Sequence, residues 1–173
     1  MTKLSPSKTR KEFAELVQKD PGNKACADCH APNPSWISTN IGVFLCIKCA
    51  SVHRSMGTQT SKIRSSVLDY WEESQMENVK KVGNTRAARV WEARLPSDFI
   101  RPGNKTHPRT RETFIREKYE KKRWLDKEEY EKVYLGKGVT KTPKTATRDL
   151  ISFEDCEGKF ENLYRTQKTK QNS

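Results

Sequence analysis

The sequence has no long hydrophobic run and little of what marks a secreted or membrane-embedded protein. No stretch approaches the ~18 consecutive apolar residues of a membrane-spanning helix, and the opening MTKLSPSKTRKEF lacks an apolar core of the secretory kind. We therefore expect a soluble protein of the cell interior. Disulfides are rare there, so clustered cysteines are expected to bind metal or to take part in chemistry.

Acidic residues are few beside basic ones. The chain has 34 Lys plus Arg against 22 Asp plus Glu, a formal net charge of +12. Such an excess either serves solubility alone or favours a phosphate-rich partner, namely nucleic acid, anionic lipid head groups or a protein that carries a nucleotide. The sequence lacks the G-x-x-x-x-G-K-[ST] motif, so we expect no nucleotide site of its own.

Apolar residues are scarce for a protein of this length. They form 33% of the 173 residues, and charged residues form 32%. A chain of this size supports one packed core with polar sequence outside it. We expect one domain over residues 1–125 and a basic C-terminal extension over 126–173 that is partly helical or disordered. Cys156, in this extension, is expected to be a free thiol without a role.

Helical spacing of apolar residues recurs along the chain and predicts a mainly α fold. The first helix is expected over residues 6–19, where apolar residues recur at i, i+3 and i+4 among charged ones. Asp69 with Glu72 resembles a capping box, which predicts a helix start there, and Gly83 is a suitable stop for that helix. The remaining expected elements are a short strand over 41–45 and helical segments over about 87–95, 109–124 and 124–135.

Four cysteines have the spacing of a zinc site. Two C-x2-C pairs separated by 16 residues can each turn two thiolates toward one point, about 2.3 Å from a tetrahedral metal ion. Four thiolates leave no open position for water, so the metal is expected to be a structural Zn²⁺. The expected ligands are Cys26, Cys29, Cys46 and Cys49.

Two histidines lie close enough to compete as ligands. His30 follows the first cysteine pair, and His53 comes four residues after the second pair. A site of three cysteines and one histidine is the second choice.

One arginine follows the second cysteine pair closely. The run from Cys46 to Gly57 leads from that pair into a short predicted helix, which ends at the glycine. Arg54 is therefore expected about a turn away from a rigid metal anchor. Its position alone would not distinguish it from an ordinary surface residue.

The sequence resembles the Arf GTPase-activating family over about residues 5–124. It shares with that family the cysteine spacing, a Trp in the zinc loop and a set of short motifs: GVFLCIKC, HRSMG, SKIRS, LDYW, a GN…WE..LP segment and FIREKYEKKR. The run GNTRAARVWEARLP is most similar to the small stromal-membrane-associated branch. The fold implied is mainly α with a small β-containing four-cysteine zinc-finger module.

The resemblance also implies roles for single residues. The family's catalytic arginine falls on Arg54 and its zinc-loop tryptophan on Trp36. Positions important for activity or for contact with the GTPase fall on Ile47, Leu68 and Asp69. Each has a plainer interpretation as well: packing for the three apolar residues, which we favour for Ile47 and Leu68, and a helix N-cap for Asp69.

The function implied is stimulation of GTP hydrolysis on an Arf-family GTPase by an arginine finger, in the regulation of vesicle traffic. The partners would be a GTP-bound Arf-family protein and an anionic Golgi or endosomal membrane, with this protein peripheral and cytoplasmic; nucleic acid is not expected. Two rival hypotheses stay open, a zinc-finger module that binds nucleic acid and an adaptor that binds a GTPase without accelerating it. Hydrolysis itself would take place in the GTPase, so the chain acts as an activator.

Overall fold

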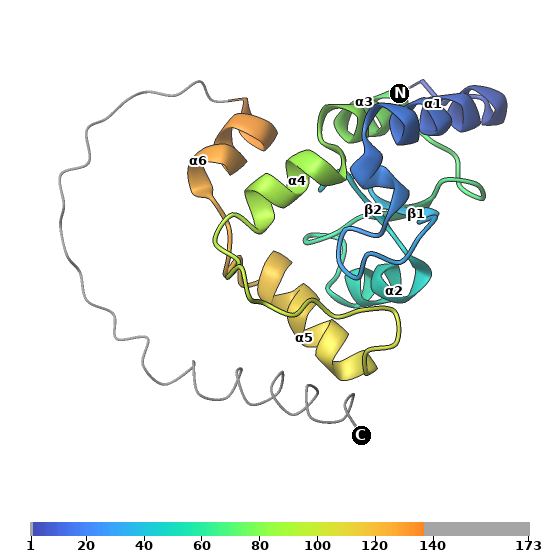
Figure 1. Ribbon diagram of the computed structural model, residues 1–173. Coiled ribbons are helices and arrows are strands. Elements are labelled where there is room, and N and C mark those ends of the chain that lie inside the picture. Colours follow the sequence, from blue (N-terminus) through green and yellow to red (C-terminus); the bar gives the residue numbers. More distant parts are fainter. Residues whose placement is uncertain (1, 137–173) are drawn as a thin grey trace. The chain divides into compact units, whose positions relative to one another are not determined.

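The computed structural model describes residues 2–136, which form helices around a small sheet (Figure 1). Most of the predicted extension, with Cys156, lies outside the described residues. Helices dominate and the strands are short, as the sequence predicts. The elements are α1 (Pro6–Lys19), the 3₁₀ helix η1 (Pro21–Lys24), β1 (Trp36–Ser38), β2 (Val43–Leu45), α2 (Ile47–Ser55), β3 (Ile63–Ser65), α3 (Glu73–Lys81), α4 (Gly83–Trp91), α5 (Pro108–Tyr119), α6 (Lys127–Tyr130) and the π-helical turn η2 (Glu131–Leu135).

Helix α1 has the bounds that its sequence predicts. The side chain of Ser5 accepts a hydrogen bond from the backbone N–H of Lys8, which satisfies one of the unpaired donors at the helix start. Phe13 and Leu16 are buried on one face of the helix. Local capping and apolar spacing therefore suffice to define this helix.

The sheet has the strand order β2-β1-β3, with both pairings antiparallel. Trp36 lies between Leu45 and Ser65, so β2 and β3 both end beside the first residue of β1. The predicted strand over 41–45 is shorter in the structure, and the other two strands were not predicted. Three-residue strands are too short to show an alternating pattern.

The sheet separates two clusters of buried side chains. Val43 and Leu45 belong to a cluster with residues of α4 and α5, whereas Phe44 and Ile37 pack with α1 and α3. Successive residues of a strand point to opposite faces, so β2 supplies both cores. The sheet is therefore central although it is small.

Helix α3 begins later than predicted. Its N-cap is Glu72, whose side chain accepts from the N3 backbone N–H, while the Gln75 side chain accepts from the Glu72 N–H. The prediction that Asp69 caps this helix is wrong, because the capping box lies three residues further on. Gly83 does follow the helix end with a left-handed φ of 69°, which an L side chain would adopt only with strain.

The second half of the described chain packs through aromatic residues. In α4 the apolar residues Val90 and Trp91 are buried. Tyr119 is buried in α5, which ends at that residue and not near 124 as predicted. Tyr134 of η2 accepts a hydrogen bond from Trp91 Nε1 at 2.9 Å and donates one to the carbonyl of Ile41 at 2.7 Å. Within residues 2–136 no helix has the length and hydropathy of a membrane-spanning segment.

Candidate functional site

The four predicted cysteine ligands come together at one point. Their Sγ atoms lie within 4.8 Å of one another, and those of Cys29 and Cys46 are 3.5 Å apart. The first pair lies in the loop between η1 and β1, and the second pair spans the junction of β2 and α2. Four thiols that converge in this way are the donor set of a closed zinc site, and the residues present fit that ion.

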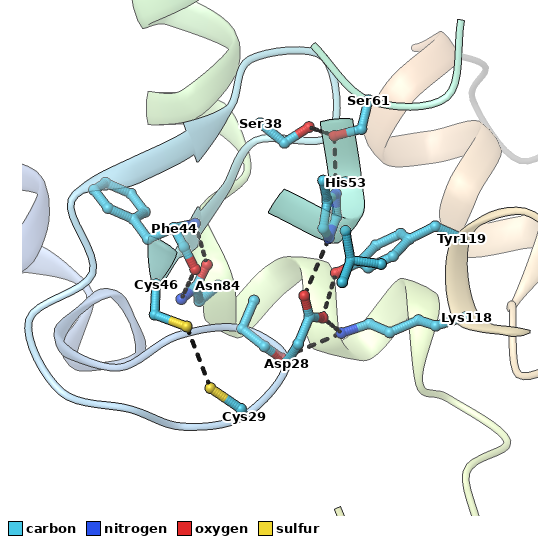
Figure 2. A network of polar contacts seen from close by, with 12 residues as sticks. Asp28, Cys29, Ser38, Phe44, Cys46, His53, Ser61, Asn84, Lys118 and Tyr119 are labelled. Atoms are coloured by element: carbon cyan, nitrogen blue, oxygen red, sulfur yellow. Dashed lines mark hydrogen bonds and ion pairs between the residues drawn. The ribbon is translucent and has the colours of Figure 1, made fainter. Parts of the chain in front are cut away.

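Neither histidine belongs to this cluster. Among the described residues the grouped metal-ligand atoms are the four cysteine sulfurs alone. His53 is fully buried and its Nε2 lies 3.1 Å from Oδ2 of Asp28, while its Nδ1 lies 2.8 Å from the hydroxyl of Ser61 (Figure 2). The alternative of three cysteines and one histidine is therefore wrong for His53, whose two ring nitrogens already have partners.

A buried network of charges lies beside the cysteine cluster. Asp28, between the two cysteines of the first pair, accepts hydrogen bonds from Lys118 Nζ at 2.9 Å and from the Tyr119 hydroxyl at 3.1 Å (Figure 2). Lys118 Nζ also lies 2.7 Å from Oε1 of Glu92, and the Arg101 guanidinium contacts both carboxylate oxygens of Glu92. The network thus joins the first cysteine pair to α5 and to the end of α4.

The opposite charges in this network stabilise the charged form of one another. Burial alone would raise the pKa of Asp28, but the Lys118 ammonium and the His53 hydrogen bond outweigh it and hold that pKa well below its ordinary value. Burial alone would lower the pKa of Lys118, which Asp28 and Glu92 instead raise well above its ordinary value. Both groups are therefore charged at neutral pH although they are buried.

Sequence reasoning missed this network. Asp28 and Lys118 are 90 residues apart, and no local pattern links them. The one available signal was an acidic residue inside a cysteine pair together with a lysine on the buried side of a predicted helix. The network fixes the inner face of α2 through His53, the residue that precedes Arg54.

Arg54 is an exposed residue of α2. Cys49, Ala50 and His53 are the buried residues of this helix, and Arg54, one turn after Ala50, is exposed at the edge of that buried face. Its guanidinium carbon lies 4.2 Å from the centroid of the Trp36 ring, a cation–π contact. No carboxylate within residues 2–136 forms an ion pair with Arg54, which leaves its hydrogen-bond donors available to a partner.

The structure contradicts the packing role that we favoured for Ile47 and Leu68. Their side chains are 63% and 79% exposed, so neither belongs to the core. Ile47, Ser51 and Arg54 follow one another at i, i+4 and i+7 and therefore share one stripe of α2. Leu68 follows β3, which ends beside Trp36 in the sheet.

Asp69 stabilises the turn that presents Leu68. Its Oδ2 accepts a hydrogen bond of 2.6 Å from the backbone N–H of Ser65, and the Ser65 hydroxyl accepts from the N–H groups of Val67 and Leu68. The residues singled out by resemblance thus gather around one end of the sheet: Trp36, Ile47, Arg54, Leu68 and Asp69.

Comparison with known proteins gives one consistent family. The ArfGap family model, described as a GTPase activating protein for Arf, matches residues 10–128. The chain is 46% identical over 115 residues to mouse stromal membrane-associated protein 1, which covers 66% of this chain and 25% of that protein. It is 40% identical over 124 residues to the ADP-ribosylation factor GTPase-activating protein effector protein 2 of Saccharomyces cerevisiae, which covers 70% of this chain and 41% of that protein.

Solved structures agree with the sequence matches. The ArfGap domain of HIV-1 Rev binding protein superposes with a TM-score of 0.64 at 25% identity, over 74% of this chain and 95% of that domain. The ArfGap domain of human RIP shares the fold with a TM-score of 0.60 at 24% identity, over 68% of this chain and 87% of that domain. The chain therefore corresponds to most of a solved domain but to less than half of the curated relatives described above.

Proposed function

The chain belongs to the ArfGap family, and on this premise we propose that it stimulates GTP hydrolysis by an Arf-family GTPase in its GTP-bound state, with Arg54 as an arginine finger. The setting of Arg54 carries the proposal. The guanidinium is exposed, has no carboxylate partner within residues 2–136 and lies over Trp36, while the helix beneath it is fixed by the buried His53.

GTP hydrolysis is accelerated by a cation held beside the negative charge that develops in the transition state. As the γ-phosphoryl group passes to water, negative charge spreads over its oxygens, and an arginine placed there in trans supplies a factor of roughly 10³ to 10⁵. The GTPase would provide the nucleotide, Mg²⁺ and the residue that orients the attacking water. Arg54 would donate hydrogen bonds from its planar fork, and the Trp36 ring would limit the conformations of its side chain.

The exposed apolar residues support a protein partner. Ile47 lies on the same stripe of α2 as Arg54, about 10 Å along the helix axis. Leu68, on its turn, adds a second exposed apolar side chain near the same end of the sheet. Apolar anchors of this kind form the centres of protein interfaces, so we assign the surface made by Trp36, Ile47, Arg54, Leu68 and Asp69 to the GTPase.

We further propose a structural Zn²⁺ bound by the four cysteines. A zinc ion at a closed four-thiolate site supplies folding energy and takes no part in the reaction. Cys46 and Cys49 would hold the start of α2, and Cys26 and Cys29 would flank Asp28. In this way both the metal site and the buried network position the helix that carries Arg54.

We also propose that the protein binds an anionic membrane surface in the cytoplasm. The net charge of +12 suits a protein that works at an anionic Golgi or endosomal surface in vesicle traffic, as a peripheral, cytoplasmic component.

The direct test is single-turnover GTP hydrolysis by a panel of Arf-family GTPases with the chain added. We expect faster hydrolysis for at least one of them. Binding to a GTP-loaded member without acceleration would favour the adaptor, and tight sequence-selective binding to duplex DNA would favour the nucleic-acid module.

A further inference from the structure

The basic residues of the segment 101–123 form two groups, those with an ion-pair partner and those without one. Residues 101–123 contain nine Lys and Arg against three Glu, an excess that favours negatively charged partners. Five of the nine form ion pairs inside the fold, and Lys122 lies over the ring of Tyr130. The five paired residues are Arg101, Arg116, Lys118, Lys121 and Arg123.

The remaining three cations, Lys105, Arg109 and Arg111, have no ion-pair partner in the part of the chain that the structure describes. Arg111 is only 4% exposed, and its Nη2 donates to the carbonyl oxygens of Gly103, Asn104 and Thr106 at 3.0, 3.1 and 3.4 Å. Its buried Nε has no hydrogen-bond partner in residues 2–136. A buried arginine paired only with neutral carbonyls leaves its positive charge uncompensated.

Lys48 of α2 contacts the same loop as Arg111. Its Nζ donates to the carbonyl oxygen and to Oδ1 of Asn104, each at 3.3 Å. The carbonyl oxygen of Asn104 therefore accepts from both Lys48 and Arg111. Two like charges that converge on one neutral oxygen create a strong local positive potential.

The ends of two helices add to this potential. Lys48, near the start of α2, contacts the loop just before α5, and Ser55, at the end of α2, contacts Arg116 further along α5. The two helices therefore run in the same direction, with their N-termini on the same side. The first turn of α5 contains no acidic residue, although an N-terminus favours negative charge.

We propose that Lys48, Lys105 and Arg109, the cationic patch, bind acidic side chains on the GTPase, and that the buried charge of Arg111 adds to the positive potential beneath them. This inference rests on the proposed function and extends its interface. Lys48 follows Ile47 directly, and its stripe of α2 lies next to the stripe that carries Arg54. An apolar anchor with a charged rim is the ordinary anatomy of a protein interface, which favours a protein over a lipid surface as the occupant.

A competing explanation is that these cations balance the thiolates of the zinc site. The observed contacts do not support it, because Lys48 and Arg111 both donate to carbonyl groups of the 103–106 loop and neither donates to a cysteine sulfur. The explanation also predicts that loss of a cation lowers zinc content, which the experiment measures.

Arg109→Glu in the whole chain is the sharpest test. Glutamate at the second position of α5 improves the helix N-terminus electrostatically, so the melting temperature and zinc content should be kept or raised. The KM for a GTP-loaded Arf-family GTPase, measured in solution without lipid, should nevertheless rise about tenfold at low salt, with kcat unchanged. The rise should shrink as salt increases. Lys105→Glu should raise the KM in the same salt-dependent way. Arg89 is an exposed cation of α4 outside the patch, so Arg89→Glu should leave the KM unchanged.

Three results would overturn the patch. One is an unchanged KM in both variants although the parent stimulates hydrolysis, which leaves the proposed function intact. Another is a defect seen only on anionic vesicles, which would assign the patch to lipid head groups. If the parent neither binds nor stimulates any GTPase tested, the proposed function itself fails and the patch assignment falls with it.

Discussion

An arginine can act on the nucleotide of another protein only if its guanidinium forms no ion pair within its own fold and its side chain is held in a defined orientation. Arg54 meets both conditions, since it has no carboxylate partner in the described chain and lies 4.2 Å from the Trp36 ring. An ion pair would have to be broken before catalysis, whereas an aromatic face can support the cation and keep its hydrogen-bond donors free. Preorganisation of this kind lowers the cost of reaching the transition state.

Leu68→Ala tests whether this exposed leucine is part of the interface with the GTPase. Because the side chain is 79% exposed, its loss should change the free energy of unfolding by no more than about 0.5 kcal/mol. Affinity for the GTPase should still fall, by about 1 to 2 kcal/mol for an apolar anchor, and equilibrium binding measures this.

Leu135→Ala is the matched control for Leu68→Ala. This leucine is also exposed, at 54%, but lies in η2. It should affect neither binding nor stability. Equal affinity of the Leu68 variant and the parent would remove this residue from the interface, and a large loss of stability would instead return it to a packing role.

Helix α2 carries Arg54, and its contacts with the rest of the fold determine where this arginine lies. Its first turn begins at Cys46 and contains Cys49, and its inner face is fixed by His53 in the buried network. The helix is short, and isolated helices of its length are marginal in water. Its conformation must therefore come from these tertiary attachments.

Lys118→Met tests the buried network. The change leaves Asp28 and Glu92 as buried carboxylates without their shared cation, and breaking a buried pair in this way should cost about 3 to 5 kcal/mol. The melting temperature should fall sharply. Lys121→Met removes an exposed lysine from Glu117, which keeps its ion pair with Arg123, so this change should cost no more than about 1 kcal/mol. Similar melting temperatures for the two variants would show that the network does not stabilise the fold.

Metal removal tests the other attachment of α2. The purified chain should contain about one Zn²⁺ per molecule, and a strong chelator should unfold it, because binding energy at a closed site is largely folding energy. Circular dichroism and metal analysis measure both effects. Cys46→Ser should resemble the chelated protein, whereas Cys156→Ser should have no effect. A folded protein without metal would contradict the zinc assignment.

How much the sequence predicts depends on how local the cause is. Helix α1 follows from the Ser5 cap and its apolar spacing, and the cysteine cluster follows from the spacing of its pairs. The contact between Asp28 and Lys118 joins residues 90 apart, so no local pattern predicts it. The exposure of Ile47 and Leu68 was also missed, because an apolar residue alone favours the interior and only the fold shows which of them are left outside.

The net charge of +12 predicts weak, salt-sensitive binding to anionic membranes. Vesicles that contain anionic lipid should retain the chain at low ionic strength and release it as salt rises toward physiological values, where the Debye length is about 8 Å. Co-sedimentation measures the bound fraction. Equal binding to neutral and anionic vesicles would mean that the charge serves solubility alone.

Single-turnover GTP hydrolysis with Arg54→Lys shows whether Arg54 acts as an arginine finger. Lysine keeps the charge but lacks the planar fork that donates two hydrogen bonds to phosphate oxygens. The variant should fold, retain zinc and bind the GTP-loaded GTPase as the parent does, yet lose at least ~10²-fold in stimulated hydrolysis, because the lost interaction is made mainly in the transition state. Stimulation within a few-fold of the parent would show that Arg54 is not the arginine finger and remove it from the mechanism.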